Sequence, residues 1–141
     1  MRIALASDHA GFDLKASLKE VCVELGHEPV DLGVDSPERV DYPDYGRALA
    51  QAVAGGEVDC GVAVCGTGIG ISIACNRVPG VRAALCHDMT TAAMSRRHND
   101  ANVLALGARI VGPQVARDCL ETFLANPFDG GRHAGRVAKL G

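Results

Sequence analysis

The 141 residues, 48% of them apolar and 22% charged, are enough for one folded domain, which we expect to span residues 1–141. The net charge of −3 argues against nucleic acid as the main partner, because binding a phosphate backbone needs a basic face. No apolar stretch approaches the ~20 residues that span a bilayer, and the start of the chain lacks a signal-peptide pattern. We therefore expect a cytoplasmic protein with no membrane partner.

Apolar runs alternate along the chain with apolar residues at helical spacing. In chain order we predict a strand at 2–7, a helix over 14–25, a strand at 30–33, a helix over 45–54, a strand at 60–64, a helix over 69–76, a strand at 81–86, a helix over 89–97, a strand at 102–106 and a helix from Gly112-Pro113 onward. The segment 35–45 is polar, contains proline and is predicted as a loop.

The predicted strands are runs of Val, Ala, Ile and Leu without polar alternation, which is typical of sheets covered by helices on both faces. We predict an α/β fold, a Rossmann-like three-layer α/β/α arrangement with a five-stranded parallel sheet and a C-terminal helical tail. In such sheets ligands bind at the carboxyl ends of the strands. This rule brings several polar residues to one edge: Asp8, His9, Cys65, His87, Asp88 and Arg109.

The segment Cys65-Gly66-Thr67-Gly68-Ile69-Gly70 follows a buried strand and places a thiol beside a glycine-rich loop. It lacks the Gly-x-Gly-x-x-Gly spacing of a dinucleotide site and the lysine of a P-loop. A cysteine phosphatase would need an arginine close after the thiol, and the next one is Arg77. A tight turn without chemical function is the alternative. The other five cysteines show no Cys-x-x-Cys pair, so we expect reduced thiols that fill the core.

Two further clusters carry charge. His98-Asn99-Asp100 ends a predicted helix, where a histidine serves either as a cap for the helix dipole or as a catalyst. We expect it at the edge that holds Cys65, giving an acid/base set with no metal. In Arg132-His133-Ala134-Gly135-Arg136, arginines four apart share a helix face and suit a phosphate dianion, although a solvated helix has the same pattern. With few apolar residues nearby, this tail is expected to dock elsewhere, for example on a second subunit.

Taken together, these motifs closely resemble type B ribose-5-phosphate isomerase along the whole chain. The matching segments are Asp8-His9-Ala10-Gly11, Asp41-Tyr42-Pro43, Cys65 to Gly70, Asn76 to Ala83, His98-Asn99-Asp100-Ala101-Asn102, and Arg132 with Arg136. The resemblance implies aldose–ketose isomerisation of a phosphorylated sugar without a metal or organic cofactor. It also implies a homodimer, or a tetramer, whose active sites are shared between subunits.

The resemblance further implies the role of each residue. The thiol matching Cys65 is the base, Thr67 and the loop N–H groups stabilise the enediolate oxygen, and His98 assists ring opening. Asp8 belongs to the catalytic group and, with Asn99, holds sugar hydroxyls, while Tyr42 lines the sugar pocket. Some members use a glutamate just past the loop, where this chain has Ile71, so it resembles the cysteine subtype. The remaining substrate-binding residues implied are Gly66, Gly68, Ile69 and Gly70 of the loop, and His9, Arg109, Arg132 and Arg136 for the phosphate.

The chemistry is consistent with this assignment. A proton next to a carbonyl is weakly acidic, so the enzyme needs a base in reach and donors for the developing oxyanion. We expect the loop N–H groups to favour the Cys65 thiolate, and Arg132 and Arg136 to govern the Michaelis constant. Two alternatives stay open: allose 6-phosphate or galactose 6-phosphate as the substrate, and a nucleotide-binding regulatory module on the same fold.

Overall fold

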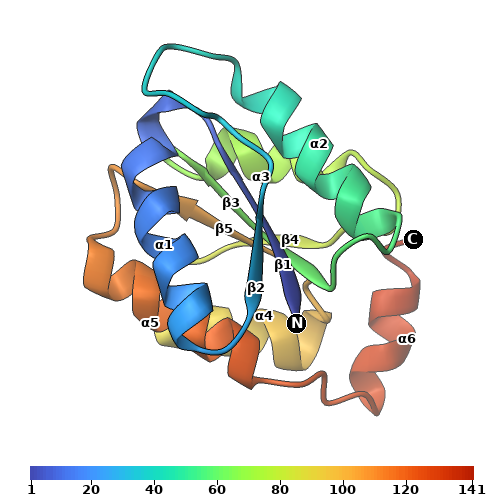
Figure 1. Cartoon of the computed structure of the whole chain (residues 1–141). Coiled ribbons are helices and arrows are strands. Elements are labelled where there is room, and N and C mark those ends of the chain that lie inside the picture. Colours follow the sequence, from blue (N-terminus) through green and yellow to red (C-terminus); the bar gives the residue numbers. More distant parts are fainter.

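The computed structural model describes all residues from Met1 to Gly141. Strands and helices alternate through most of the chain, and the last two elements are helices (Figure 1). Their bounds are β1 (Arg2–Ser7), the 3-10 turn η1 (His9–Gly11), α1 (Phe12–Glu24), β2 (Glu28–Asp31), α2 (Tyr42–Ala54), β3 (Cys60–Cys65), α3 (Ile69–Asn76), β4 (Ala83–Leu85), α4 (Met89–Asn99), β5 (Val103–Gly107), α5 (Pro113–Ala125) and α6 (Arg132–Ala138).

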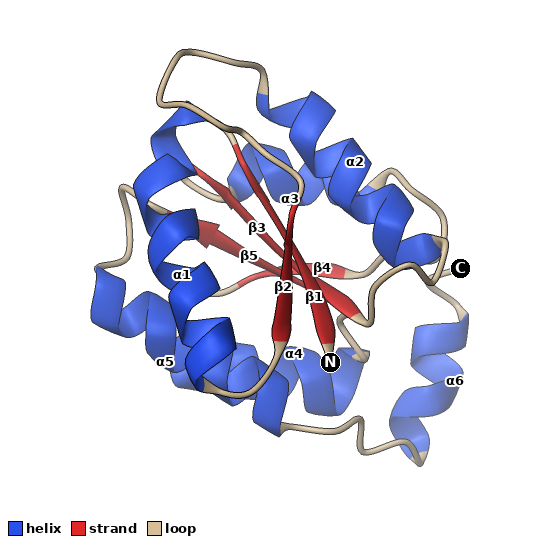
Figure 2. Ribbon diagram, in the orientation of Figure 1, coloured by secondary structure: helices blue, strands red, loops and turns tan.

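The five strands form one parallel sheet in the order β2-β1-β3-β5-β4. Helices cover both faces, α1, α4 and α5 on one side and α2 and α3 on the other (Figure 2). The predicted three-layer α/β fold with five parallel strands is therefore confirmed. No helix is long and apolar enough to cross a bilayer.

The alternation of side chains along each strand divides the core in two. In β1, Ile3 and Leu5 pack towards α1 and α5, whereas Ala4 and Ala6 face α2. The second face carries small residues so that α2 can approach closely: a Cβ on Gly61 would lie 2.6 Å from a methyl carbon of Leu49. Because β3 packs closely against α2, the end of the strand at Cys65 is held in place, and so is the start of the loop that follows it.

Several predicted boundaries were wrong by two or three residues, most clearly those of β2, α2 and β4. β2 begins at Glu28, not at residue 30, because the Glu28 N–H pairs with the Met1 carbonyl at 2.9 Å and because an edge strand tolerates Pro29. The helix α2 starts at Tyr42, inside the predicted loop, since Pro43 in its first turn needs no N–H partner. β4 is limited to Ala83–Leu85, shorter than the predicted strand at 81–86.

A buried lysine connects the first helix to the loop after β2. Lys15 is 2% exposed, and its Nζ donates to Asp31 Oδ1 at 2.6 Å and to the Val34 carbonyl at 2.7 Å. Burial alone would raise the pKa of the Asp31 carboxyl, but hydrogen bonds from Lys15, Lys19 and the Gly33 N–H lower it to about 2. The ionised pair therefore holds this loop against α1.

We expect the Asp31 interaction to stabilise the fold above pH 4 and to be lost as the pH falls towards 2, because the pKa is depressed in the folded state. After allowance for solvent screening, the loss should be about 1 to 2 kcal/mol. Urea unfolding of the wild type and Asp31→Asn should give free energies that converge between pH 4 and 2. Asp35→Asn, which makes the same charge change at a side chain without a hydrogen bond, is the control. A difference that does not vary with pH would contradict this account.

Candidate active site

The carboxyl ends of the central strands bring the first group of polar residues together. The Asp8 N–H donates to the Val64 carbonyl at 3.2 Å, which places the end of β1 beside the end of β3. The Arg109 N–H donates to the Gly66 carbonyl at 2.9 Å, which brings the residues after β5 to the same point. The predicted convergence of Asp8, Cys65 and Arg109 at one edge of the sheet is thus confirmed.

Cys65 is the last residue of β3, and the residue is 4% exposed. The Gly68 N–H donates to its Sγ at 3.1 Å, and the helix α3 begins one residue later at Ile69. A backbone N–H and a helix N-terminus both stabilise negative charge nearby. The N–H groups of Gly66 and Thr67 donate to no acceptor within the chain, so two unpaired donors stand next to the thiol.

Two glycines allow this loop to adopt its position: Gly68 within the loop and Gly107 in the neighbouring strand β5. Gly68 has a φ of +78°, and a Cβ there would lie 2.5 Å from a methyl carbon of Leu85. Gly107, at the end of β5, supports the loop from below: a Cβ on it would lie 2.5 Å from the carbonyl carbon and oxygen of Thr67. The loop is therefore pressed against the β5 backbone, which fixes its distance from Cys65.

The other cysteines differ from Cys65 in their surroundings. All six thiols are free and buried, which confirms the expectation of core residues without disulfides. Burial raises the pKa of Cys60 to about 11 and that of Cys119 to about 11. Burial, and then the neighbouring Cys65, raise the pKa of Cys75 to about 12. These three thiols stay protonated at neutral pH.

Asp8 and His9 are fixed by the turn that follows β1. One carboxylate oxygen of Asp8, Oδ1, accepts the N–H groups of Ala10 at 2.9 Å and Gly11 at 3.2 Å, so this residue caps the turn. The other oxygen makes no hydrogen bond within the chain. The Val40 N–H donates to Nδ1 of His9 at 3.2 Å. In the neutral ring the proton is consequently on Nε2, which is free to donate.

Tyr42 and Arg109 pack against the loop, whereas Asp88 lies at the start of α4. The Tyr42 ring packs on Gly70 so closely that a Cβ on the glycine would lie 2.5 Å from it. The Arg109 guanidinium lies over Gly66, with Nη1 3.3 Å from the position of a Cβ there. Asp88 caps α4 by accepting the Thr91 N–H at 2.7 Å, and this hydrogen bond lowers its pKa. Asp88 is thus occupied by a structural role.

His98 and Asn99 do not lie at this edge, so the expectation that they join Cys65 within one chain was wrong. The helix α4 starts at the carboxyl edge and runs back over roughly 16 Å, for eleven residues at about 1.5 Å each. Its last turn reaches the amino edge of the sheet. There Asp100 pairs with Arg82, the residue before β4, and Arg96 lines a cavity together with Met1 and Cys60.

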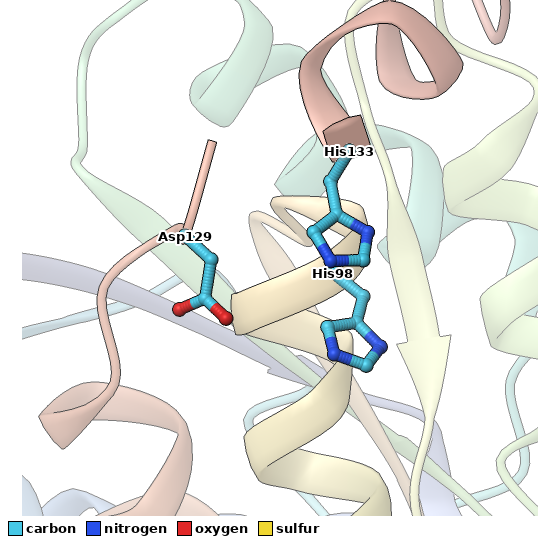
Figure 3. A group of neighbouring side chains, drawn as sticks. All are labelled: His98, Asp129 and His133. Atoms are coloured by element: carbon cyan, nitrogen blue, oxygen red, sulfur yellow. The ribbon is translucent and has the colours of Figure 1, made fainter. Parts of the chain in front are cut away.

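The C-terminal tail packs against the end of α4 in the same chain. The rings of His98 and His133 are stacked, with centroids 4.3 Å apart and planes 11° apart (Figure 3). Arg132 and Arg136 are exposed on α6, on either side of His133 in the sequence. The structure therefore groups His98, Asn99, Arg132 and Arg136 at one edge of the sheet, and Asp8, His9, Tyr42, Cys65, Thr67 and Arg109 at the other.

Asp129 completes a cluster with the two rings. Each of His98, Asp129 and His133 has one potential metal-ligating atom, and these three atoms all lie within 4.8 Å of one another. In Figure 3 a nitrogen of each histidine ring lies on the side of the Asp129 carboxylate. Such donors suit a transition metal, but Asp129 already pairs with Arg97 at 3.2 Å, and the nearby arginines oppose a second cation. Burial, and then the charges of His98, Arg132 and Arg136, lower the pKa of His133.

Sequence reasoning assigned no role to Val40, Asp129 or His133. Val40 acts through its backbone N–H, which leaves no signal in residue identity. The spacing of four residues between Asp129 and His133 is a usable signal for a shared helix face, but only His133 lies within α6. The partner ring comes from α4, and only the folded chain shows that it is His98.

The chain is similar to known proteins along nearly its whole length. Residues 3–140 match the family described as Ribose/Galactose Isomerase. Ribose-5-phosphate isomerase B of Escherichia coli (strain K12) is 49% identical, with 99% of this chain and 93% of that protein covered. D-erythrulose-4-phosphate isomerase of Pectobacterium atrosepticum is 39% identical over 100% of this chain and 93% of its own length. The structure of Clostridium thermocellum ribose-5-phosphate isomerase B superimposes with a TM-score of 0.99 at 52% identity, covering 100% of this chain and 95% of that one.

Proposed function

Because this chain belongs to the ribose/galactose isomerase family and is a sugar-phosphate isomerase, we propose that it interconverts ribose 5-phosphate and ribulose 5-phosphate through an enediolate. The observation that carries the proposal is the Cys65 thiol beneath a glycine loop whose Gly68 N–H points at the sulfur. The similarity to ribose-5-phosphate isomerases of known structure supports the choice of the five-carbon sugar. A nucleotide-binding module is not favoured, since the match covers nearly the whole chain.

Cys65 acts as the base in this proposal. Its thiolate takes the proton from C2 of the open-chain aldose, and the electron pair of that bond moves through C1 to the carbonyl oxygen. The unpaired N–H groups of Gly66 and Thr67, with the Thr67 hydroxyl, stabilise the enediolate oxygen. A proton then passes from the C2 hydroxyl to the C1 oxygen, and the thiol returns its proton to C1. The product carries its carbonyl at C2, and no redox cofactor is consumed.

The other residues bind the sugar from two sides. Asp8 offers its unpaired carboxylate oxygen to a hydroxyl, and Tyr42 closes the pocket beside the loop. His9 presents its Nε2–H and Arg109 its guanidinium to the phosphate. The second group, at the amino edge, comprises His98 for ring opening, Asn99 for a hydroxyl, and Arg132 and Arg136 for the phosphate.

A complete site needs two chains in this proposal. The two groups lie at opposite edges of the sheet in one chain, separated by the length of α4. One substrate of five carbons cannot reach both, so the carboxyl edge of one subunit faces the amino edge of a second copy. This is the arrangement that the resemblance implies for a homodimer with shared active sites.

The length of the sugar provides a direct test of the separate roles. Ribose 5-phosphate closes into a ring through its C4 hydroxyl, whereas erythrose 4-phosphate carries its phosphate at that position and stays open. The erythrulose-4-phosphate isomerase among the relatives supports this shorter sugar as a probe. Turnover numbers and Michaelis constants should also be compared for allose 6-phosphate and galactose 6-phosphate, with EDTA present. A preference for either six-carbon sugar would overturn the proposed substrate.

We expect His98→Gln to lower kcat/KM for ribose 5-phosphate by roughly 100-fold, because an acid/base group for ring opening is lost. The same variant should change kcat/KM for erythrose 4-phosphate little, since that sugar needs no ring opening. His27→Gln, which alters a histidine outside the proposed site, is the matched control. Equal losses on both sugars would assign His98 to the proton transfer or to the fold, not to ring opening.

A further inference from the structure

The helix α6 is held to the rest of the chain by few side chains. His133 is its one buried residue, at 7% exposure, and Gly131 and Gly135 add no apolar surface. The loop before α6 is bound to α4 by other contacts: the Asp129 N–H donates to the Arg97 carbonyl, and the Asp129 carboxylate pairs with the Arg97 guanidinium. The position of α6 therefore depends on where the His133 ring is seated.

That seat is the ring of His98. The two imidazole rings are stacked and nearly parallel, with centroids 4.3 Å apart. If His133 moves, the His98 ring loses the surface against which it packs. The same helix carries Arg132 and Arg136, both of which are exposed. One contact thus joins the helix with the two phosphate-binding arginines to the histidine proposed for ring opening.

We propose that His133 is a positioning residue that fixes the His98 ring and the helix carrying Arg132 and Arg136 in one arrangement. This inference builds on the proposed function of those three residues. It adds a role for a histidine that touches neither the sugar nor the phosphate in the proposed site. Since misplacement of a catalytic group by about 1 Å can cost roughly 100-fold in rate, the stack is expected to affect turnover as well as binding.

The charges around the stack make it sensitive to acid. His133 faces His98, with Arg97, Arg132 and Arg136 nearby and Asp129 as the acidic neighbour. If both rings are protonated, two positive charges lie 4.3 Å apart beside these arginines. The pKa of His133 is lowered in the folded chain, so docking of α6 is complete above the ordinary histidine pKa of about 6.5 and weakens as the pH falls below it.

Two substitutions separate the flat ring from its charge. His133→Ala removes the stack but keeps a good helix former, and His133→Phe keeps a flat ring that never carries charge. Lys139→Ala, an exposed change at the end of the same helix, is the control. The first measurement is amide hydrogen exchange over residues 132–138 in the full-length protein, at pH 5.5 and pH 7.5 with intrinsic rates corrected. The second is kcat and KM for ribose 5-phosphate.

We expect His133→Ala to lose protection of α6, to lower kcat roughly 10- to 100-fold and to raise KM. His133→Phe should restore most of the protection and of kcat, and its protection should not fall at pH 5.5 as that of the wild type does. Retained kcat in His133→Ala, or failure of His133→Phe to rescue it, would overturn the proposal. Hydrogen exchange is measured without the sugar, so it tests the anchoring of α6 independently of the proposed function. If His133→Ala loses protection but the wild type does not isomerise ribose 5-phosphate, the anchoring is supported and the proposed function is contradicted.

Discussion

Replacing Cys65 by alanine is expected to lower kcat/KM by roughly 100- to 10,000-fold, on both ribose 5-phosphate and erythrose 4-phosphate. In the proposed mechanism this substitution removes the group that moves the proton between C1 and C2, a step that both sugars require. The substituted side chain is small and lies at the end of β3, so the fold should persist. Steady-state kinetics, together with urea unfolding of the same preparation, measure the two effects separately.

Cys119→Ala is the matched control for this experiment. It removes another buried thiol, on α5 and on the opposite face of the sheet, and burial raises the pKa of that thiol to about 11. Its activity should stay close to that of the wild type. Alkylation followed by peptide mass mapping should also modify Cys65 before Cys60, Cys75 or Cys119. Activity within tenfold of the wild type in Cys65→Ala would show that the base lies elsewhere.

The second large effect is expected for Gly107→Ala. The added Cβ would lie 2.5 Å from the carbonyl carbon and oxygen of Thr67, and a backbone cannot swing aside as a flexible side chain can. The loop must therefore rise from β5 or the strand must bend. We expect a loss of about 1 to 3 kcal/mol in unfolding free energy. We also expect a drop of roughly 100-fold in kcat/KM, because the loop N–H groups move relative to Cys65.

Gly112→Ala is the control for this glycine. It lies five residues after Gly107, at the start of α5, with an ordinary φ of −75°, and a Cβ there would meet nothing within 4 Å. Denaturant unfolding and kinetics on ribose 5-phosphate should leave it near the wild type. If Gly107→Ala matched this control in both assays, the contact with Thr67 would not be what holds the loop.

The sequence predicted the sheet and the convergence of Asp8, Cys65 and Arg109 at one edge because both depend on local patterns. An uninterrupted apolar run such as Cys60 to Val64 specifies a buried strand, and parallel strands bring their carboxyl ends to one edge. The placement of His98 was wrong, although the same topology decides it. A helix that connects two parallel strands must run back across the sheet, so its last residue lies at the amino edge.

Other features depend on contacts that residue identity does not encode. The stack of His133 on His98 requires the path of the loop through Gly130 and Gly131, both with positive φ, to return the chain to α4. The tail was expected to dock elsewhere, for example on a second subunit; within one chain α6 contacts α4, and its docking on a second subunit stays a prediction. Likewise, the early start of α2 depends on Asp41 adopting an extended conformation just before Tyr42 and Pro43.

The run of α4 from one edge of the sheet to the other has a kinetic consequence. Because the two residue groups lie at opposite edges, the shared-site proposal implies that a folded chain without a second copy holds both groups but cannot bring them to one substrate. Under the shared-site proposal, folding and activation are separate events, and the second follows mass action. At dilutions where chains are mostly apart, the rate should rise with the square of the chain concentration, and only above this range in simple proportion to it.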